Sequence, residues 1–161
     1  MKKLILIRHA KSDWSMSLDD FDRTLTQRGK DDAKAVAREF KQSLPDPLTI
    51  WSSSARRASL TADIMIREWN LPPDRVDFKF DLYTFNWQRL ADIIRQADDS
   101  IDCLCIFGHN EGITEFVNNF GDIYIDNVPT AGLVCLDFEA NRWQDISQGK
   151  ITRTLFPKSL R

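Results

Sequence analysis

The stretch IDCLCIFGHNEG, Ile101 to Gly112, contains an apolar run of strand length that ends abruptly in polar residues. A continuous apolar run of this kind is typical of a strand that is buried on both faces at the centre of a parallel sheet. His109 follows directly, and apolar residues then recur at helical spacing at Ile113, Phe116, Val117 and Phe120. The stretch therefore predicts a central strand, a polar strand end and a helix that returns over the sheet.

The same alternation of strand and helix extends outward on both sides. The apolar runs at 3–7, 48–53 and 76–80 predict three more strands, and helices are predicted from Thr26, around 58–69 and around 90–97. The runs at 131–138, 142–147 and 151–156 are interpreted as closing strands. The pattern predicts an α/β fold with three α/β/α layers and a mainly parallel central sheet, formed as a single domain by residues 1–161.

Composition restricts the class of protein. The 161 residues carry a formal charge of −2, which gives no basic field for nucleic acid. No apolar run approaches the length of a membrane span, and four apolar residues before Arg8 are too few for the core of a signal peptide. The three cysteines lie in apolar runs and are expected to be buried reduced thiols. A cytoplasmic protein is therefore expected.

Polar residues follow each of the four predicted parallel strands. Because ligands of such sheets bind beyond the carboxyl ends of the strands, these residues are candidates for one site. Both histidines of the chain are among them, which weakens the interpretation of either one as an isolated surface residue. The residues, in chain order, are Arg8, His9, Arg56, Arg57, Asp81 and His109.

A phosphoryl group is the ligand that suits these residue types best. Guanidinium groups match phosphate oxygens bidentately, and the helix starts after two of the strands add backbone N–H groups. Two histidines and a carboxylate could instead hold zinc or iron, but the neighbouring arginines raise the electrostatic cost of a dication. No metal and no cofactor are expected.

Four segments together resemble the motifs of the histidine phosphatase superfamily, which has the phosphoglycerate-mutase-like fold. The resemblance covers nearly the whole chain, and the short length is most similar to the SixA-like branch of phosphohistidine phosphatases. The segments are LIRHAKS at 6–12, DFDRTLTQRG at 20–29, SSARRASLTA at 53–62 and FGHNEGI at 107–113.

The resemblance implies roles for four of the strand-end residues. His9 matches the nucleophile, Arg8 and Arg57 match the phosphate-binding arginines, and His109 matches the second catalytic histidine. His109 is expected to act as an imidazolium. Arg57 rather than Arg56 is the match, because it directly precedes the Ala-x-x-Thr-Ala part of the motif.

The chain departs from the family pattern in two places. Ala10 stands where the family has glycine after the nucleophile, and no glutamate stands where larger members have their general acid. Asp81 is the nearest candidate for that acid. Lys11 and Arg23 are further candidates for substrate contacts. Trp14 is a candidate wall of the cleft, together with Phe85 or Trp87.

The expected function is that of a metal-independent phosphatase that forms a covalent phosphohistidine on His9. Its expected substrates are phosphohistidine proteins or small phosphate monoesters. A non-catalytic phosphate-binding module, a phosphomutase and a metal-dependent hydrolase remain as alternatives at this stage. The phosphorylated substrate is the expected partner, with no nucleic acid and no membrane, and the sequence leaves the oligomeric state open.

Overall fold

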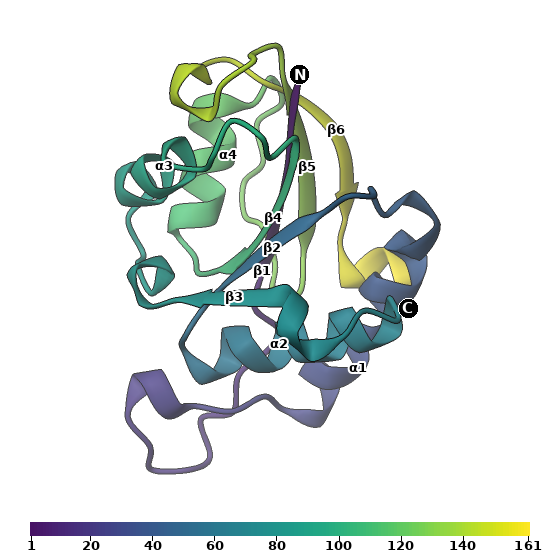
Figure 1. The fold of residues 1–161 in the computed structure, drawn as a ribbon. Helices are drawn as coiled ribbons and strands as arrows, with labels where there is room; N and C mark the ends of the chain where they lie inside the picture. Colours follow the sequence, from purple (N-terminus) through teal and green to yellow (C-terminus); the bar gives the residue numbers. More distant parts are fainter.

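The computed structural model describes residues 1–161, and six strands form one sheet in the order β3-β2-β4-β1-β5-β6 (Figure 1). The first four strands along the chain pair in parallel, and β5 runs antiparallel to both of its neighbours. The predicted mainly parallel sheet is therefore confirmed. The strands are β1 (Lys2–Arg8), β2 (Thr49–Ser53), β3 (Val76–Lys79), β4 (Cys103–Gly108), β5 (Leu133–Phe138) and β6 (Lys150–Leu155).

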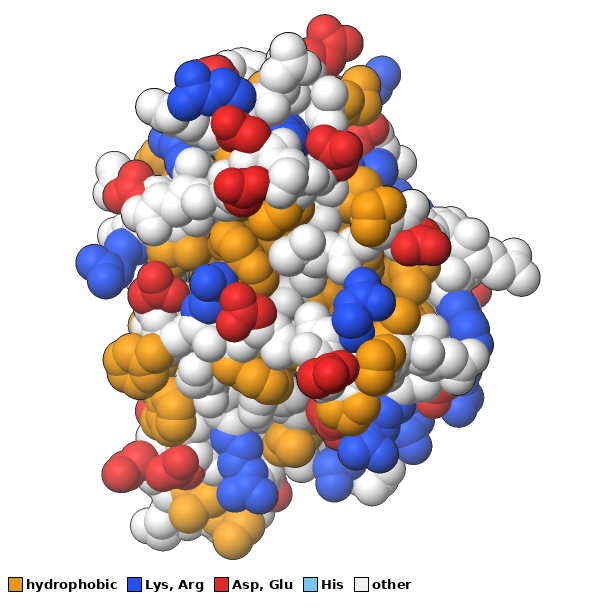
Figure 2. All heavy atoms as spheres, in the orientation of Figure 1, with side chains coloured by type: hydrophobic (Ala, Val, Ile, Leu, Met, Phe, Trp, Pro, Cys, Tyr) orange, Lys and Arg blue, Asp and Glu red, His pale blue; other side chains and the backbone are white.

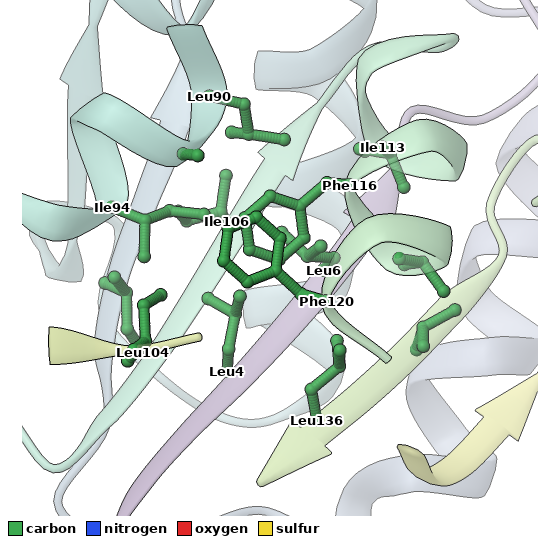
Figure 3. Close-up of a cluster of buried hydrophobic side chains, with 14 of the residues drawn as sticks. Leu4, Leu6, Leu90, Ile94, Leu104, Ile106, Ile113, Phe116, Phe120 and Leu136 are labelled. Atoms are coloured by element: carbon green, nitrogen blue, oxygen red, sulfur yellow. The ribbon is translucent and has the colours of Figure 1, made fainter. Parts of the chain in front are cut away.

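Helices cover both faces of the sheet, as predicted. Helices α1 (Gln27–Phe40) and α2 (Arg56–Glu68) pack on one face, and α3 (Trp87–Arg95) and α4 (Gly112–Phe120) pack on the other. Successive residues of a strand point to opposite faces, so β1 divides its apolar residues between the two cores. Leu4 and Leu6 join the α3–α4 side (Figure 3), and Ile5 and Ile7 join the α1–α2 side.

The predicted strand at 142–147 is wrong. Residues Trp143–Asp145 form a short 3-10 turn, and β6 pairs directly with β5. The Trp143 side chain is fully buried, and its indole N–H donates to the Ile101 carbonyl at 2.7 Å. Trp143 thus fills the core from a turn, and alternation of apolar residues alone does not distinguish that placement from a strand.

The carboxyl ends of the parallel strands are covered by two loops. One joins β1 to α1 and the other joins β3 to α3, and both contain short 3-10 turns, Asp20–Asp22 and Phe80–Leu82. The first loop packs so closely on the start of α1 that a Cβ at Gly29 would collide with the Lys11 carbonyl oxygen. This contact explains the glycine that ends the DFDRTLTQRG segment.

On the face of the molecule that is viewed in Figure 1, hydrophobic side chains are interspersed with charged ones (Figure 2). No helix is both long enough and apolar enough to cross a membrane. All three cysteines are free thiols, of which Cys105 and Cys135 are buried and Cys103 is half-buried.

Candidate active site

His9 is held at the carboxyl end of β1 by backbone bonds on two sides. Its N–H donates to the Gly108 carbonyl at the end of β4 at 3.1 Å. On the other side, the Ala131 N–H donates to the His9 carbonyl at 3.0 Å, and the Arg8 N–H donates to the Gly132 carbonyl at 3.0 Å. The histidine thus stands on a rigid mount between the central strand and the turn before β5.

Hydrogen bonds fix the tautomer of the His9 ring. Nδ1 lies 2.7 Å from the Ala10 carbonyl oxygen, which can only accept, so Nδ1 carries the proton. Nε2 is therefore the nitrogen with the lone pair, and it accepts from Arg57 Nε at 3.3 Å. The side chain presents a nucleophilic nitrogen directly beside a guanidinium group.

The surroundings of His9 keep its ring neutral. Burial, together with the positive charges of Arg57, Arg8 and Arg23, lowers the pKa of His9 from 6.5 to about 4. A histidine with this pKa holds an unprotonated Nε2 throughout the neutral range. This is the state that a nitrogen nucleophile requires.

Ala10 fits its position without strain. It is fully buried, and positive φ angles occur only at Asn70 and Ala131, so the absent glycine is not needed here. The Ala10 N–H donates to Thr61 Oγ1 at 2.9 Å, and Thr61 in turn donates to the Arg57 carbonyl at 2.7 Å. The threonine of the second motif therefore joins the first turns of α2 to the residue after His9.

His109 faces His9 across the site, with the two ring centroids 5.4 Å apart. Its Nε2 lies 2.8 Å from Ser53 Oγ. Ser53 Oγ also accepts from the Ala55 N–H at 3.2 Å, which leaves its hydroxyl proton free to donate to His109. In that arrangement the ring proton of His109 is on Nδ1, and Nδ1 is buried without any hydrogen-bond partner.

His109 is neutral in this structure, and its expected imidazolium form beside a bound phosphoryl dianion stays a prediction. Burial, followed by the charges of His9 and Arg57, lowers the pKa of His109 to about 3, so the ring is neutral. Its unpartnered Nδ1 nevertheless offers a hydrogen bond to an anionic oxygen. A neutral donor of this kind can bind an anionic oxygen without adding a further positive charge beside the three arginines.

Three arginines meet at the same place. Arg57 and Arg23 are buried, Arg8 is half-buried, and Arg8 donates from one terminal nitrogen to the Val128 carbonyl at 3.0 Å. The buried side-chain polar atoms without a partner are Arg8 Nε, Arg23 Nε and His109 Nδ1. All three belong to residues of this site, and all three are suited to donate to an anion.

The three arginines line an open cavity of about 390 Å³. The cavity brings together the predicted residues His9, Arg8, Arg57, Lys11 and Arg23. His109 is not among the lining residues, but its ring packs against His9 and bonds to Ser53. Trp14 and Phe85 form apolar walls, whereas Trp87 instead packs on Phe120. The remaining lining residues are Ser12, Asp20, Asn110 and Thr130.

The donor set suits an anion rather than a cation. The structure holds no group of three or more His, Cys, Asp or Glu side chains that could bind a metal ion. Four cationic side chains line the cavity, against the single carboxylate of Asp20. The charge of the cavity therefore matches a phosphoryl dianion.

The structure does not bring Asp81 into the cavity, which argues against its assignment as a candidate general acid. Asp81 is exposed in the turn Phe80–Leu82 and is absent from the cavity lining. The turn directs Leu82 into the core and Tyr83 toward His109 instead, with the Tyr83 and His109 ring centroids 5.4 Å apart. The carboxylate in the cavity is that of Asp20, from the other loop.

Replacing Asp81 with Asn is accordingly expected to change kcat/KM by less than about twofold. This should hold even for an alkyl phosphate, whose leaving group needs a proton. A true general acid would contribute ~10²–10⁴-fold. Steady-state kinetics of wild type and Asp81→Asn on one alkyl ester test this expectation. A loss of a hundredfold would show that the loop moves Asp81 into the site during turnover.

The two buried neutral histidines also predict a pH-dependent stability. As pH falls below 6.5, the unfolded chain takes up protons on both rings and the folded chain does not. The free energy of unfolding therefore falls until about pH 4 through His9 and until about pH 3 through His109. The double variant His9→Gln/His109→Gln contains no histidine. Between pH 7 and pH 5, wild type should lose about 2–4 kcal/mol more than this variant in urea unfolding. Equal losses would contradict the lowered pKa values.

Comparisons with known proteins show what the chain is similar to. The model of the family described as histidine phosphatase superfamily (branch 1) matches residues 4–78, which include the first three motifs. An uncharacterized chloroplast protein of Arabidopsis thaliana is 29% identical over 153 residues, which cover 89% of this chain and 70% of that protein.

Two solved structures share the fold over nearly their whole length. A protein assigned as the phosphohistidine phosphatase SixA from Agrobacterium tumefaciens superposes with a TM-score of 0.78 at 23% identity, covering 96% of this chain and 97% of that one. The protein histidine phosphatase SixA complexed with tungstate gives 0.83 at 15% identity, covering 99% of both chains. The chain is thus similar to the histidine phosphatase superfamily over residues 4–78, and it has the phosphoglycerate-mutase-like fold of the SixA structures.

Proposed function

We propose that the protein is a metal-independent phosphatase that transfers a phosphoryl group to His9 Nε2 and then to water. The observation that carries this proposal is the orientation of the His9 ring. Nδ1 donates to the Ala10 carbonyl, so the neutral Nε2 carries the lone pair beside Arg57 in a cationic cavity. The match of residues 4–78 to the histidine phosphatase family model also supports a phosphatase.

In the first step, the phosphoryl group of the substrate enters between His9 and the arginines. Arg57 Nε exchanges its hydrogen bond to His9 for one to a phosphoryl oxygen, which frees the Nε2 lone pair. Nε2 then attacks phosphorus in line, a P–N bond forms, and the bond from phosphorus to the leaving group breaks with its electron pair on that group. Arg8, Arg57 and His109 Nδ1–H stabilise the charge on the equatorial oxygens.

In the second step, water attacks phosphorus on the phosphohistidine. The P–N bond breaks, its electron pair returns to Nε2, and inorganic phosphate leaves with the oxygen of the water. His9 regains the neutral tautomer that its bond to the Ala10 carbonyl favours. No metal takes part in either step.

The leaving group decides which substrates react fast. An alkoxide needs a proton as it leaves, and the only carboxylate of the cavity is paired with arginines. The imidazole of a phosphohistidine can be protonated on its other nitrogen before the P–N bond breaks, so it needs no acid from the protein. The absence of a free acid thus supports phosphohistidine as the substrate, and the similarity to structures named as SixA phosphohistidine phosphatases supports it independently.

The rim of the cavity supports a macromolecular substrate. Trp14 and Phe85 line the cavity yet are 75% and 51% exposed, and Phe80 on the same loop as Phe85 is 69% exposed. Side chains of this size on an open rim suit contact with the surface of another protein. A phosphorylated histidine on a protein surface can reach such a site.

The substrate assignment is tested by comparing a phosphorylated histidine protein with an alkyl phosphate, both in excess chelator. We expect kcat/KM to be higher for the phosphohistidine by at least about a hundredfold, the range that an acid would otherwise supply. Equal values would contradict the argument from the leaving group. Loss of activity on chelation would contradict the metal-free mechanism.

A further inference from the structure

Asp20 is the single carboxylate in a cavity lined by four cationic side chains, which are Arg8, Lys11, Arg23 and Arg57. It begins the 3-10 turn Asp20–Asp22 in the loop between β1 and α1. Neither the spacing of motifs nor the proposed chemistry gives this carboxylate a role. An acidic side chain at a site for a phosphoryl dianion opposes binding of that ligand by charge repulsion, so its presence needs a physical explanation.

The carboxylate binds the same donors that a phosphoryl group would use. Oδ2 accepts from a terminal nitrogen of Arg57 at 3.0 Å, and Oδ1 accepts from a terminal nitrogen of Arg23 at 2.8 Å. The other terminal nitrogen of Arg57 donates to the Asp20 carbonyl at 2.6 Å. With Nε directed at His9, every nitrogen of Arg57 is engaged by a partner within the chain.

A third donor comes from the loop between β3 and α3. The Tyr83 hydroxyl donates to Asp20 Oδ2, and the Tyr83 ring packs edge-on against Phe21, Phe85 and His109. Asp20 therefore connects the two loops that cover the strand ends. Its side chain is nevertheless 44% exposed, so water can solvate the carboxylate when these bonds break.

We propose that Asp20 is an internal counter-ion that competes with the substrate's phosphoryl group for Arg57 and Arg23, and so sets the affinity of the site. The inference rests on the proposed function for the identity of the ligand. Binding of a phosphoryl group displaces the carboxylate toward solvent and releases Tyr83 from it. Without a ligand, the carboxylate neutralises two buried guanidinium groups.

A proton cannot replace the ligand in this displacement. Burial acts to raise the pKa of Asp20, but the hydrogen bonds from Tyr83, Arg23 and Arg57 and the charge of Arg57 outweigh it and hold that pKa well below its usual range. Asp20 stays ionised across the neutral range. Only another anion can take over its partners.

The test is calorimetric titration of inorganic phosphate into wild type, Asp20→Asn and Asp22→Asn. Asn keeps the shape and one acceptor oxygen of Asp20 but removes its charge, and we expect phosphate to bind roughly tenfold more tightly. Asp22 lies in the same turn, is exposed, and its side chain makes no hydrogen bond or ion pair, so Asp22→Asn is the matched control for the change in net charge.

A second variant, Tyr83→Phe, keeps the ring contacts and removes one donor to Asp20. Its phosphate affinity should lie between those of wild type and Asp20→Asn, because the carboxylate is then held less firmly. Weaker binding by Asp20→Asn would show that Asp20 positions Arg57 for the ligand, which overturns the inference. Affinities equal to that of Asp22→Asn, or no phosphate binding by any variant, would also overturn it.

The binding experiment does not depend on catalysis. If wild type hydrolyses phosphorylated substrates and Asp20→Asn binds phosphate no more tightly, the inference fails and the proposed function stands. If no variant is a phosphatase but Asp20→Asn binds phosphate more tightly, the proposed function fails and the competition by Asp20 stands.

Discussion

His9→Ala is expected to lower the hydrolysis of an aryl phosphate at least about a thousandfold, because the reaction loses its nucleophile and with it the covalent route. An aryl leaving group needs little help from an acid, so this substrate isolates the nucleophile from the question of the leaving-group proton. The assay is carried out in excess chelator, where wild type should remain active.

The His9→Ala variant should remain folded and still bind phosphate. The substitution leaves the backbone bonds of Arg8 and His109 and the position of Arg57 in α2 unchanged. The backbone of residue 9 also keeps its bonds to Gly108 and Ala131. Circular dichroism and phosphate titration provide these controls. Residual activity near that of wild type would mean that water attacks the substrate directly, and the role of His9 would then be wrong.

Arg57→Ala should produce the second large loss, about 10²–10⁴-fold in kcat/KM. Arg57 is 2% exposed, donates to His9 Nε2 at 3.3 Å and lines the cavity. It is thus the cation nearest to the position of the transferred phosphoryl group. Arg57→Lys should recover only part of this loss, because an ammonium group cannot donate bidentately to phosphoryl oxygens.

Arg56→Ala is the matched control for Arg57→Ala. The two arginines are adjacent in the first turn of α2, but Arg56 is exposed and is absent from the cavity lining. The kcat/KM of Arg56→Ala should stay within about threefold of wild type, the scale of an exposed charge screened by solvent. Equal losses in both variants would indicate a general effect of charge rather than a contact with the substrate.

The order of strands and helices was predictable because each strand carries its own local signal. Four apolar runs ended in polar residues and alternated with helical patterns, and this alternation indicates parallel strands whose carboxyl ends share one edge. That topology predicted the convergence of residues 8–9, 56–57 and 109, and the resemblance to the family motif selected Arg57 over Arg56. Hydrogen bonds between the strand ends then set the details, such as the bond from His9 to Gly108.

Loop geometry was not predictable in the same way. Asp81 and Asp20 both lie in short 3-10 turns of the covering loops, and only the folded structure decides which carboxylate enters the cavity. Asp20 stood in the segment that resembles the family, three residues before Arg23, and that spacing was its only signal. Ser53, at the end of β2, was likewise visible in a motif, but its bond to His109 was not.

The neutral form of His109 in this structure was not predictable from the sequence, for a physical reason. The positions of these residues after the predicted strands indicate that two histidines and several arginines lie close together. They do not indicate how deeply each side chain is buried. His109 is 2% exposed, and this burial, together with the nearby charge of Arg57, lowers its pKa to about 3.

Identification of a phosphorylated intermediate tests the central claim most directly. Wild type is mixed with a fast substrate, quenched within one turnover in alkali, where phosphohistidine survives, and its peptides are analysed by mass spectrometry. The account predicts a phosphoryl group on His9 and on no other residue, and none in His9→Ala. Turnover by wild type without any phosphorylated peptide, or with the phosphoryl group on His109, would contradict it.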